Sequence, residues 1–181
     1  MPTARPRRPA PAEPVADPAA CREEALRLLE RTRRTRADLA RRLRTKGHVA
    51  AVVDEVLDRL AAVGLVDDVE YARAFLAGRW GRRAAGWTRL RLELRQRGVR
   101  DDDIAAARAR FEAESGGADE LATARRAVEQ AAGRMRGLES RVRQRRLYGL
   151  LARRGFAPDT IRQALQLAED DADPETDPTP R

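Results

Sequence analysis

The sequence has little of what most metal sites, secreted proteins and membrane proteins depend on. It contains a single cysteine, Cys21, and a single histidine, His48, among 181 residues. One cysteine excludes a disulfide within the chain and weakly favours the cytoplasm, and a zinc site built from several His and Cys ligands is not available. No apolar stretch approaches the roughly 18–20 residues of a membrane span, and the start of the chain lacks the apolar block of a secretory signal. We therefore expect a cytoplasmic protein that binds neither a metal ion nor a membrane.

Motifs that would hold a nucleotide or organise catalysis are also missing. The chain has no Gly-Lys-Ser/Thr phosphate loop and no Rossmann glycine fingerprint. His48 follows a predicted helix-stop glycine and has no acid and nucleophile near it in the sequence. The acidic runs at 67–68 and 101–103 fall where helices are expected to begin, so capping and the helix dipole explain them more simply than a divalent metal does. We therefore expect no enzyme activity and no cofactor.

The residues that are abundant are strong helix formers. The composition is 42% hydrophobic and 36% charged, with only 4% aromatic residues, and Ala, Arg, Leu and Glu are frequent. No run of alternating β-branched residues is present, so the sequence predicts an all-α protein. Lys46 is the only lysine, and every other basic residue is arginine.

A pattern of leucine, leucine and glycine, each four residues apart, occurs three times. The three sets are Leu39–Leu43–Gly47, Leu90–Leu94–Gly98 and Leu147–Leu151–Gly155. Leucines four apart share one face of a helix, and a glycine just past the last turn is the favoured left-handed stop. Six residues after each glycine stands a β-branched aliphatic residue that would face the core from the next helix: Val53, Ile104 and Ile161. The recurrence predicts an internal repeat with room for three short helices in each unit.

We expect nine helices in three tandem three-helix repeats, forming an elongated, curved array stabilised by packing between neighbouring units. The predicted helices lie near residues 20–32, 35–47, 49–64, 67–80, 87–97, 101–114, 119–132, 138–154 and from 158. The predicted segments are a disordered tail at 1–18, repeats at 19–64, 65–115 and 116–168, and a disordered acidic tail at 169–181. Both tails are Pro-rich and poor in large apolar residues. The acidic tail either competes with a polyanion for the basic body or is simply solvated.

The formal net charge is +8, and basic residues gather in three clusters. In the helix predicted at 138–154, four arginines share a side opposite an apolar side formed by Leu147, Tyr148, Leu150 and Leu151. These four are Arg141, Arg145, Arg146 and Arg153. Such an array suits a phosphate backbone or an acidic protein, and the alternative is a solvated face that keeps the protein soluble.

The second basic cluster surrounds a basic break between helices, predicted at residues 81–86. It comprises Arg79, Arg82, Arg83, Arg89, Arg91, Arg95 and Arg97, of which Arg82, Arg83, Arg91 and Arg95 are candidate contacts to DNA. Trp87 lies beside it and would stack on a base or, more commonly for such a position, pack in the core, as we expect for Trp80 and Tyr71. A third cluster has weaker segregation and comprises Arg31, Arg33, Arg34, Arg41, Arg42, Arg44 and Lys46.

The middle of the chain contains the segment GLVDDVEYARAF at 64–75, followed by Arg79 and by the spacing of Gly86, Leu90, Leu94, Gly98 and Val99. This pattern resembles the central repeat of RecX regulatory proteins. Residues 143–161 resemble the last repeat of that family, with its Leu-x-x-Arg-Gly-aromatic core. The resemblance covers about residues 19–168. Trp87 departs from it, because a small residue or proline often follows the glycine there, and the two charged tails are not part of the pattern.

The resemblance implies a non-enzymatic modulator of RecA recombinase. Proteins of this family consist of three tandem three-helix repeats, bind the RecA–DNA filament along its helical groove, and usually inhibit its ATPase and strand exchange. The partners it implies are the RecA filament and, through phosphate contacts, single- and double-stranded DNA. We expect a monomer.

Two other classes remain open from the residues alone. A regulator that binds DNA directly through a helix-turn-helix unit is compatible with three-helix units that carry basic helices. Such a regulator normally has one DNA-reading unit and a dimer interface, whereas this chain repeats its unit three times. The third class is a protein adaptor whose arginines only keep it solvated.

Overall fold

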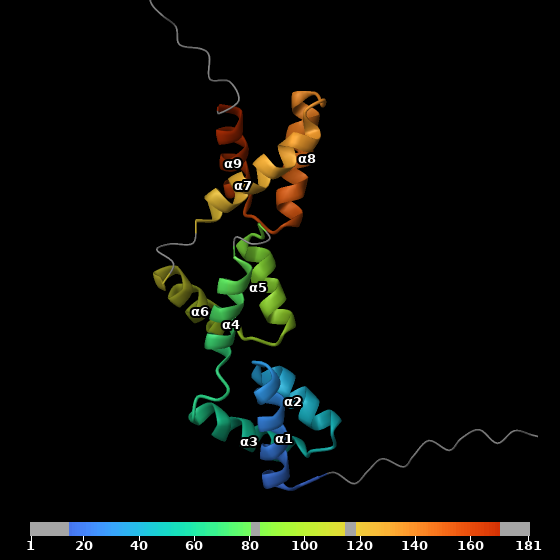
Figure 1. Cartoon of the computed structure of the whole chain (residues 1–181), viewed down its shortest axis with the longest axis vertical. Helices are drawn as coiled ribbons and strands as arrows, with labels where there is room; N and C mark the ends of the chain where they lie inside the picture. Colours follow the sequence, from blue (N-terminus) through green and yellow to red (C-terminus); the bar gives the residue numbers. More distant parts are fainter. Residues whose placement is uncertain (1–14, 81–83, 115–118, 171–181) are drawn as a thin grey trace, which may run out of the picture. The chain divides into compact units, whose positions relative to one another are not determined.

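The computed structural model describes residues 15–80, 84–114 and 119–170, and these residues are almost entirely helical (Figure 1). The described helices are α1 (Pro18–Arg31), α2 (Arg36–Thr45), α3 (Ala50–Ala62), α4 (Asp68–Arg79), α5 (Trp87–Gln96), α6 (Asp101–Glu114), α7 (Glu120–Ala132), the 3-10 helix η1 (Gly133–Met135), α8 (Ser140–Arg153) and α9 (Pro158–Asp170). The prediction of an all-α protein of three-helix repeats is confirmed. The chain divides into two compact units, Met1–Asp67 (unit 1) and Asp68–Arg181 (unit 2), so the second and third repeats share one unit. The elongated, curved arrangement stays a prediction.

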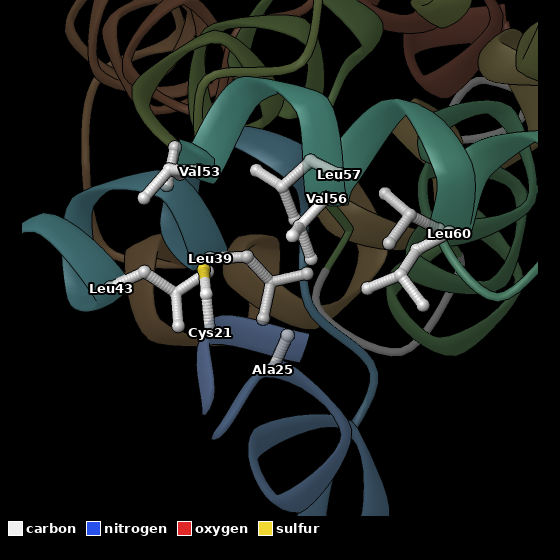
Figure 2. Close-up of a cluster of buried hydrophobic side chains, with 10 residues drawn as sticks. Cys21, Ala25, Leu39, Leu43, Val53, Val56, Leu57 and Leu60 are labelled. Atoms are coloured by element: carbon white, nitrogen blue, oxygen red, sulfur yellow. The ribbon is translucent and has the colours of Figure 1, made fainter. Parts of the chain in front are cut away.

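Unit 1 packs α1, α2 and α3 around one apolar core, shown in Figure 2. Leu39 and Leu43 of α2 are fully buried, and Val53 of α3 meets them as the repeat pattern predicted. The start of α2 is fixed by Thr35, whose hydroxyl oxygen accepts a hydrogen bond from the Asp38 amide at 3.1 Å. The helix is followed by Gly47 at φ +96°, a conformation that an L side chain rarely adopts.

Residues 15–18, assigned above to the N-terminal tail, belong to unit 1 in the structure. The Val15 amide donates to the Gly47 carbonyl at 2.8 Å, and the Val15 carbonyl accepts from the Val49 amide at 3.1 Å. The Asp17 carboxylate accepts from the Ala19 amide at 2.8 Å and caps α1. The helix therefore begins at Pro18 rather than at residue 20, because proline fits a first helical turn. Residues 1–14 lie outside the described part of the chain.

Unit 2 contains two cores, one for each repeat. The first joins α4, α5 and α6 and includes the fully buried Leu94 and the 1% exposed Leu90 and Ile104. The second joins α7, α8 and α9 and includes Leu147, Leu151 and Ile161 with no more than 5% exposure. The leucines and downstream aliphatics that defined the repeat are thus core residues in all three repeats. Helix α9 continues to Asp170, two residues beyond the predicted repeat boundary, and residues 171–181 lie outside the described chain.

The two repeats of unit 2 meet where the start of α5 contacts the turn between α8 and α9. We call this contact, formed by residues 86–88 and 154–155, the α5–α8 seam. The Gly86 amide donates to the Arg154 carbonyl at 2.8 Å, and the Thr88 amide donates to the Gly155 carbonyl at 3.2 Å. A Cβ on Gly86 would overlap the Gly155 carbonyl, and a Cβ on Gly155 would overlap the backbone of Arg89. Both glycines are therefore required for this close backbone approach.

Candidate polyanion-binding surface

Helix α8 is an unusual helix because it contains five arginines and no carboxylate between Ser140 and Arg153. It has no acidic residue in its first turn, and its N-cap, Glu139, makes no side-chain capping hydrogen bond. Arg141 and Arg143 stand instead near the positive end of the helix dipole, where cations are unfavourable. Sites that break such local preferences are often functional.

The four arginines predicted to share a face are exposed on α8, opposite the buried Leu147 and Leu151. They are Arg141, Arg145, Arg146 and Arg153. None of the four side chains has a hydrogen bond or an ion pair with another residue in the part of the chain that the structure describes. Their positive charge is available to an external anion. We call them the α8 arginine face.

The described candidate arginines of the middle repeat differ from the α8 arginine face because they lie beside carboxylates. Arg91 donates to Asp101 at 3.0 Å, and Arg95 lies 3.9 Å from the same carboxylate. Glu93 pairs with Arg79 at 3.2 Å and with Arg89 at 3.3 Å. Internal carboxylates therefore neutralise part of this cluster. Arg82 and Arg83 lie outside the described residues.

The basic cluster of unit 1 is also paired internally. Asp38 accepts hydrogen bonds from Arg34 and Arg42 at 2.8 Å each and from Arg41. Burial raises the pKa of Asp38, but the hydrogen bonds from Arg42 and Arg34 outweigh burial and hold it below its usual value. Lys46 pairs with Glu24 at 2.7 Å, and this hydrogen bond lowers the pKa of Glu24. This cluster therefore ties the helices of unit 1 together.

The aromatic residues near the middle cluster pack against the core. Trp87, Trp80 and Tyr71 are partly buried against the core of the second repeat, which confirms the core interpretation for all three. The guanidinium of Arg108 lies 4.4 Å from the centre of the Trp87 ring and covers that face. The Trp87 amide donates to the Glu120 carboxylate at 2.8 Å, which fixes the start of α5 from another repeat. Local sequence patterns do not predict this partner, because Glu120 stands 33 positions further along the chain.

A groove of about 480 Å³ runs between α8 and α9, beside the α8 arginine face. Its lining comprises Arg141, Gln144, Arg145, Tyr148, Arg162, Leu165 and Gln166. Tyr148, which the helical pattern placed on the apolar side of α8, is 40% exposed. Arg162 and Gln166 were not among the predicted site residues, although their spacing of four on α9 places both on one helix face. Arg162 pairs with Asp159, and both side chains are largely exposed.

Within the described ranges, no three His, Cys, Asp or Glu residues come close enough together to hold a metal ion. None of the helices in those ranges is both long and apolar enough to cross a membrane.

The fold and this surface define a helical-repeat protein with an exposed cationic face. Profiles of the RecX family match all three repeats: the first three-helix domain at residues 21–60, the second at 67–107 and the third at 118–165. The chain belongs to the RecX family.

Relatives and solved structures agree with the profiles. The chain is 42% identical over 139 residues to the regulatory protein RecX of Thermobifida fusca, covering 77% of this chain and 73% of that protein. It is 38% identical over 146 residues to the regulatory protein RecX of Mycobacterium tuberculosis strain H37Rv, covering 80% and 82%. The crystal structure of RecX from Lactobacillus salivarius has the same fold, with a TM-score of 0.76 at 20% identity over 84% of this chain and 96% of that one.

Proposed function

We propose that this protein is a non-enzymatic regulator that binds the RecA–DNA nucleoprotein filament in the cytoplasm and inhibits its ATPase, strand exchange and growth. Through these effects it would influence recombinational DNA repair and the SOS response. Membership of a family whose relatives are named regulatory proteins supports a regulatory role. The observation that carries the contact is the α8 arginine face, whose four side chains have no internal partner among the described residues.

The mechanism that fits this surface is occupancy. A nucleoprotein filament presents a row of phosphates together with acidic protein surface, and arginines bind both while releasing counterions. Three repeats in one chain allow contacts with more than one filament subunit. A protein bound in this way restricts the subunit movements that ATP turnover requires, and it needs no chemistry of its own.

The test is a titration of RecA with this protein in the presence of single-stranded DNA. We expect the rate of DNA-dependent ATP hydrolysis to fall, and the protein alone to hydrolyse no ATP. A rate that stays constant across the titration would overturn the proposal. Binding to bare duplexes of several sequences is measured in parallel, because strong preference for one sequence with no effect on RecA would favour a direct DNA-binding regulator.

A further inference from the structure

The groove between α8 and α9 has a composition that the α8 arginine face alone does not explain. Three cationic side chains enter its lining from two helices: Arg141, Arg145 and Arg162. An aromatic ring, two carboxamides and Leu165 complete the wall, and the lining contains no carboxylate. The groove thus places a 40% exposed aromatic ring, Tyr148, among cationic side chains.

We propose that this groove binds unpaired nucleotides of a single strand, with Tyr148 as the stacking surface for a base. Single-strand sites combine a cationic groove for the backbone with an aromatic ring on which a base stacks. Arg141 and Arg145 stand one helical turn apart on α8 and face successive phosphates, while the exposed Gln166 offers both donors and acceptors to a base edge. The proposal rests on the proposed function for its biological setting, because it refines the contact made by the same helix.

The volume and the ring together select this ligand class. A groove of about 480 Å³ falls within the 300–1,000 Å³ that is usual for small-ligand sites, so it accommodates a nucleotide or two. A duplex keeps its base faces stacked inside the helix, where Tyr148 cannot reach them. An acidic peptide would use the arginines and leave the ring without a partner. The groove therefore discriminates single strands from duplexes through one residue.

The test measures binding of the full-length protein, without RecA, to a fluorescent oligothymidylate and to a duplex of equal length. We expect Tyr148→Ala to weaken single-strand binding by about 5-fold to 150-fold, the usual loss for one stacked base. Duplex binding, which uses phosphate contacts, should change by less than about 2-fold, and Tyr148→Phe should retain single-strand binding because it keeps the ring. Val142→Ala is the matched control, because Val142 is 38% exposed on the same helix but does not line the groove.

Three outcomes would overturn the proposal. One is a Tyr148→Ala variant that keeps its helicity and binds single strands like the parent. A second is an equal loss of single-strand and duplex binding. The third is a pair of results: deletion of residues 171–181 raises the affinity for single strands, and Tyr148→Ala leaves that affinity unchanged. This pair would assign the groove to an acidic peptide. Each readout is independent of RecA, so failure here leaves the ATPase test intact, and failure of that test leaves the single-strand site standing.

Discussion

At the scale of single residues, one carboxylate organises the junction between two helices of unit 1. Arg34 donates through Nη1 to Asp38 at 2.8 Å and through Nε to the carbonyl of Leu28 in α1 at 3.1 Å. Asp38 thus holds the arginine that links the end of α1 to the start of α2. Its side chain is 19% exposed, so solvent screens these bonds less than it screens the surface pairs of the other helices.

This arrangement makes the stability of unit 1 depend on pH. Because Arg42 and Arg34 lower the pKa of Asp38 in the folded protein, its contribution is present above the unfolded-state pKa and is lost as pH falls through the folded-state value. We expect the free energy of unfolding to decrease as pH falls from about 5 towards 3. Urea unfolding followed by far-UV circular dichroism at several pH values measures this.

Asp38→Asn is the matching variant. It should lower stability at pH 7 by about 1–2 kcal/mol, because the amide is a weaker acceptor for arginine. The variant should also lose less stability than the parent on acidification. Parallel pH curves for the two proteins would show that other carboxylates govern the acid transition.

Residues also show where sequence patterns stop being informative. The Thr35 cap and the Gly47 stop follow from local chemistry, and both are present in the structure. Two carboxylates come from helices other than the one they contact. Glu120 accepts a hydrogen bond from the Trp87 amide, and Asp101 lies between Arg91 and Arg95. Only the folded arrangement decides which arginines lie beside a carboxylate, and Arg91 and Arg95 stay predicted contacts although Asp101 neutralises part of their charge.

At the scale of elements, α8 has an apolar side that packs in the core of the third repeat and a cationic side whose arginines have no internal partner among the described residues. Changing Arg141, Arg145, Arg146 and Arg153 to Gln should therefore weaken filament binding while leaving helicity intact. Where DNA phosphate is the partner, the slope of log affinity against log salt should flatten by up to about 0.7 for each lost contact to a single strand. Affinity measured at several salt concentrations checks both parts.

Leu147→Asp is the control for this helix. Leu147 is 5% exposed in the third core, so a carboxylate there should unfold the repeat and abolish binding through loss of stability. The quadruple Gln variant should lose binding without that unfolding. If it folds and binds filaments like the parent, the arginine face is only solvated, and the middle repeat around Arg91 and Arg95 becomes the candidate contact.

The α5–α8 seam is the second element-scale feature, and it depends on backbone rather than side chains. The positive end of α5 meets the negative end of α8, so the two helix dipoles are favourably aligned across the seam. Gly155 has φ +81°, and a Cβ there would also overlap Arg89. Gly155→Ala should lower the stability of unit 2 by about 2–4 kcal/mol. Gly137→Ala is the control, since a Cβ at Gly137 meets nothing within 4 Å, and thermal melting compares the two.

At the scale of the whole molecule, periodicity predicted the helices well because each repeat unit is locally encoded. Leucine spacing, caps and glycine stops act within one or two turns, and α6 has the predicted ends, Asp101 and Glu114. The grouping of repeats into two units was not predictable in this way. It depends on the seam at Gly86 and Gly155, where residues far apart in sequence approach through their backbones.

Truncating the chain ends should show which terminal residues contribute to stability. Deleting residues 1–14 and 171–181 removes few large apolar side chains, so thermal stability should hardly change. Extending the N-terminal deletion through residue 18 removes the Asp17 cap and the Val15 bridge, and should cost about 1–2 kcal/mol. Calorimetry of the two truncated proteins tests this, and a large loss from the shorter deletion would show that a tail packs on the fold.

The single cysteine and the two tryptophans lie in different units, so each unit has its own signal for unfolding. Cys21, the only thiol, is fully buried in unit 1, and burial raises its pKa, so a thiol reagent modifies it only when that unit opens. Both tryptophans, Trp80 and Trp87, lie in unit 2, so indole emission follows that unit alone. A partner that binds only the third repeat will raise the denaturant concentration at which tryptophan emission changes. It will leave the rate of Cys21 labelling unchanged. The two signals of the unmodified chain therefore show which unit a partner stabilises.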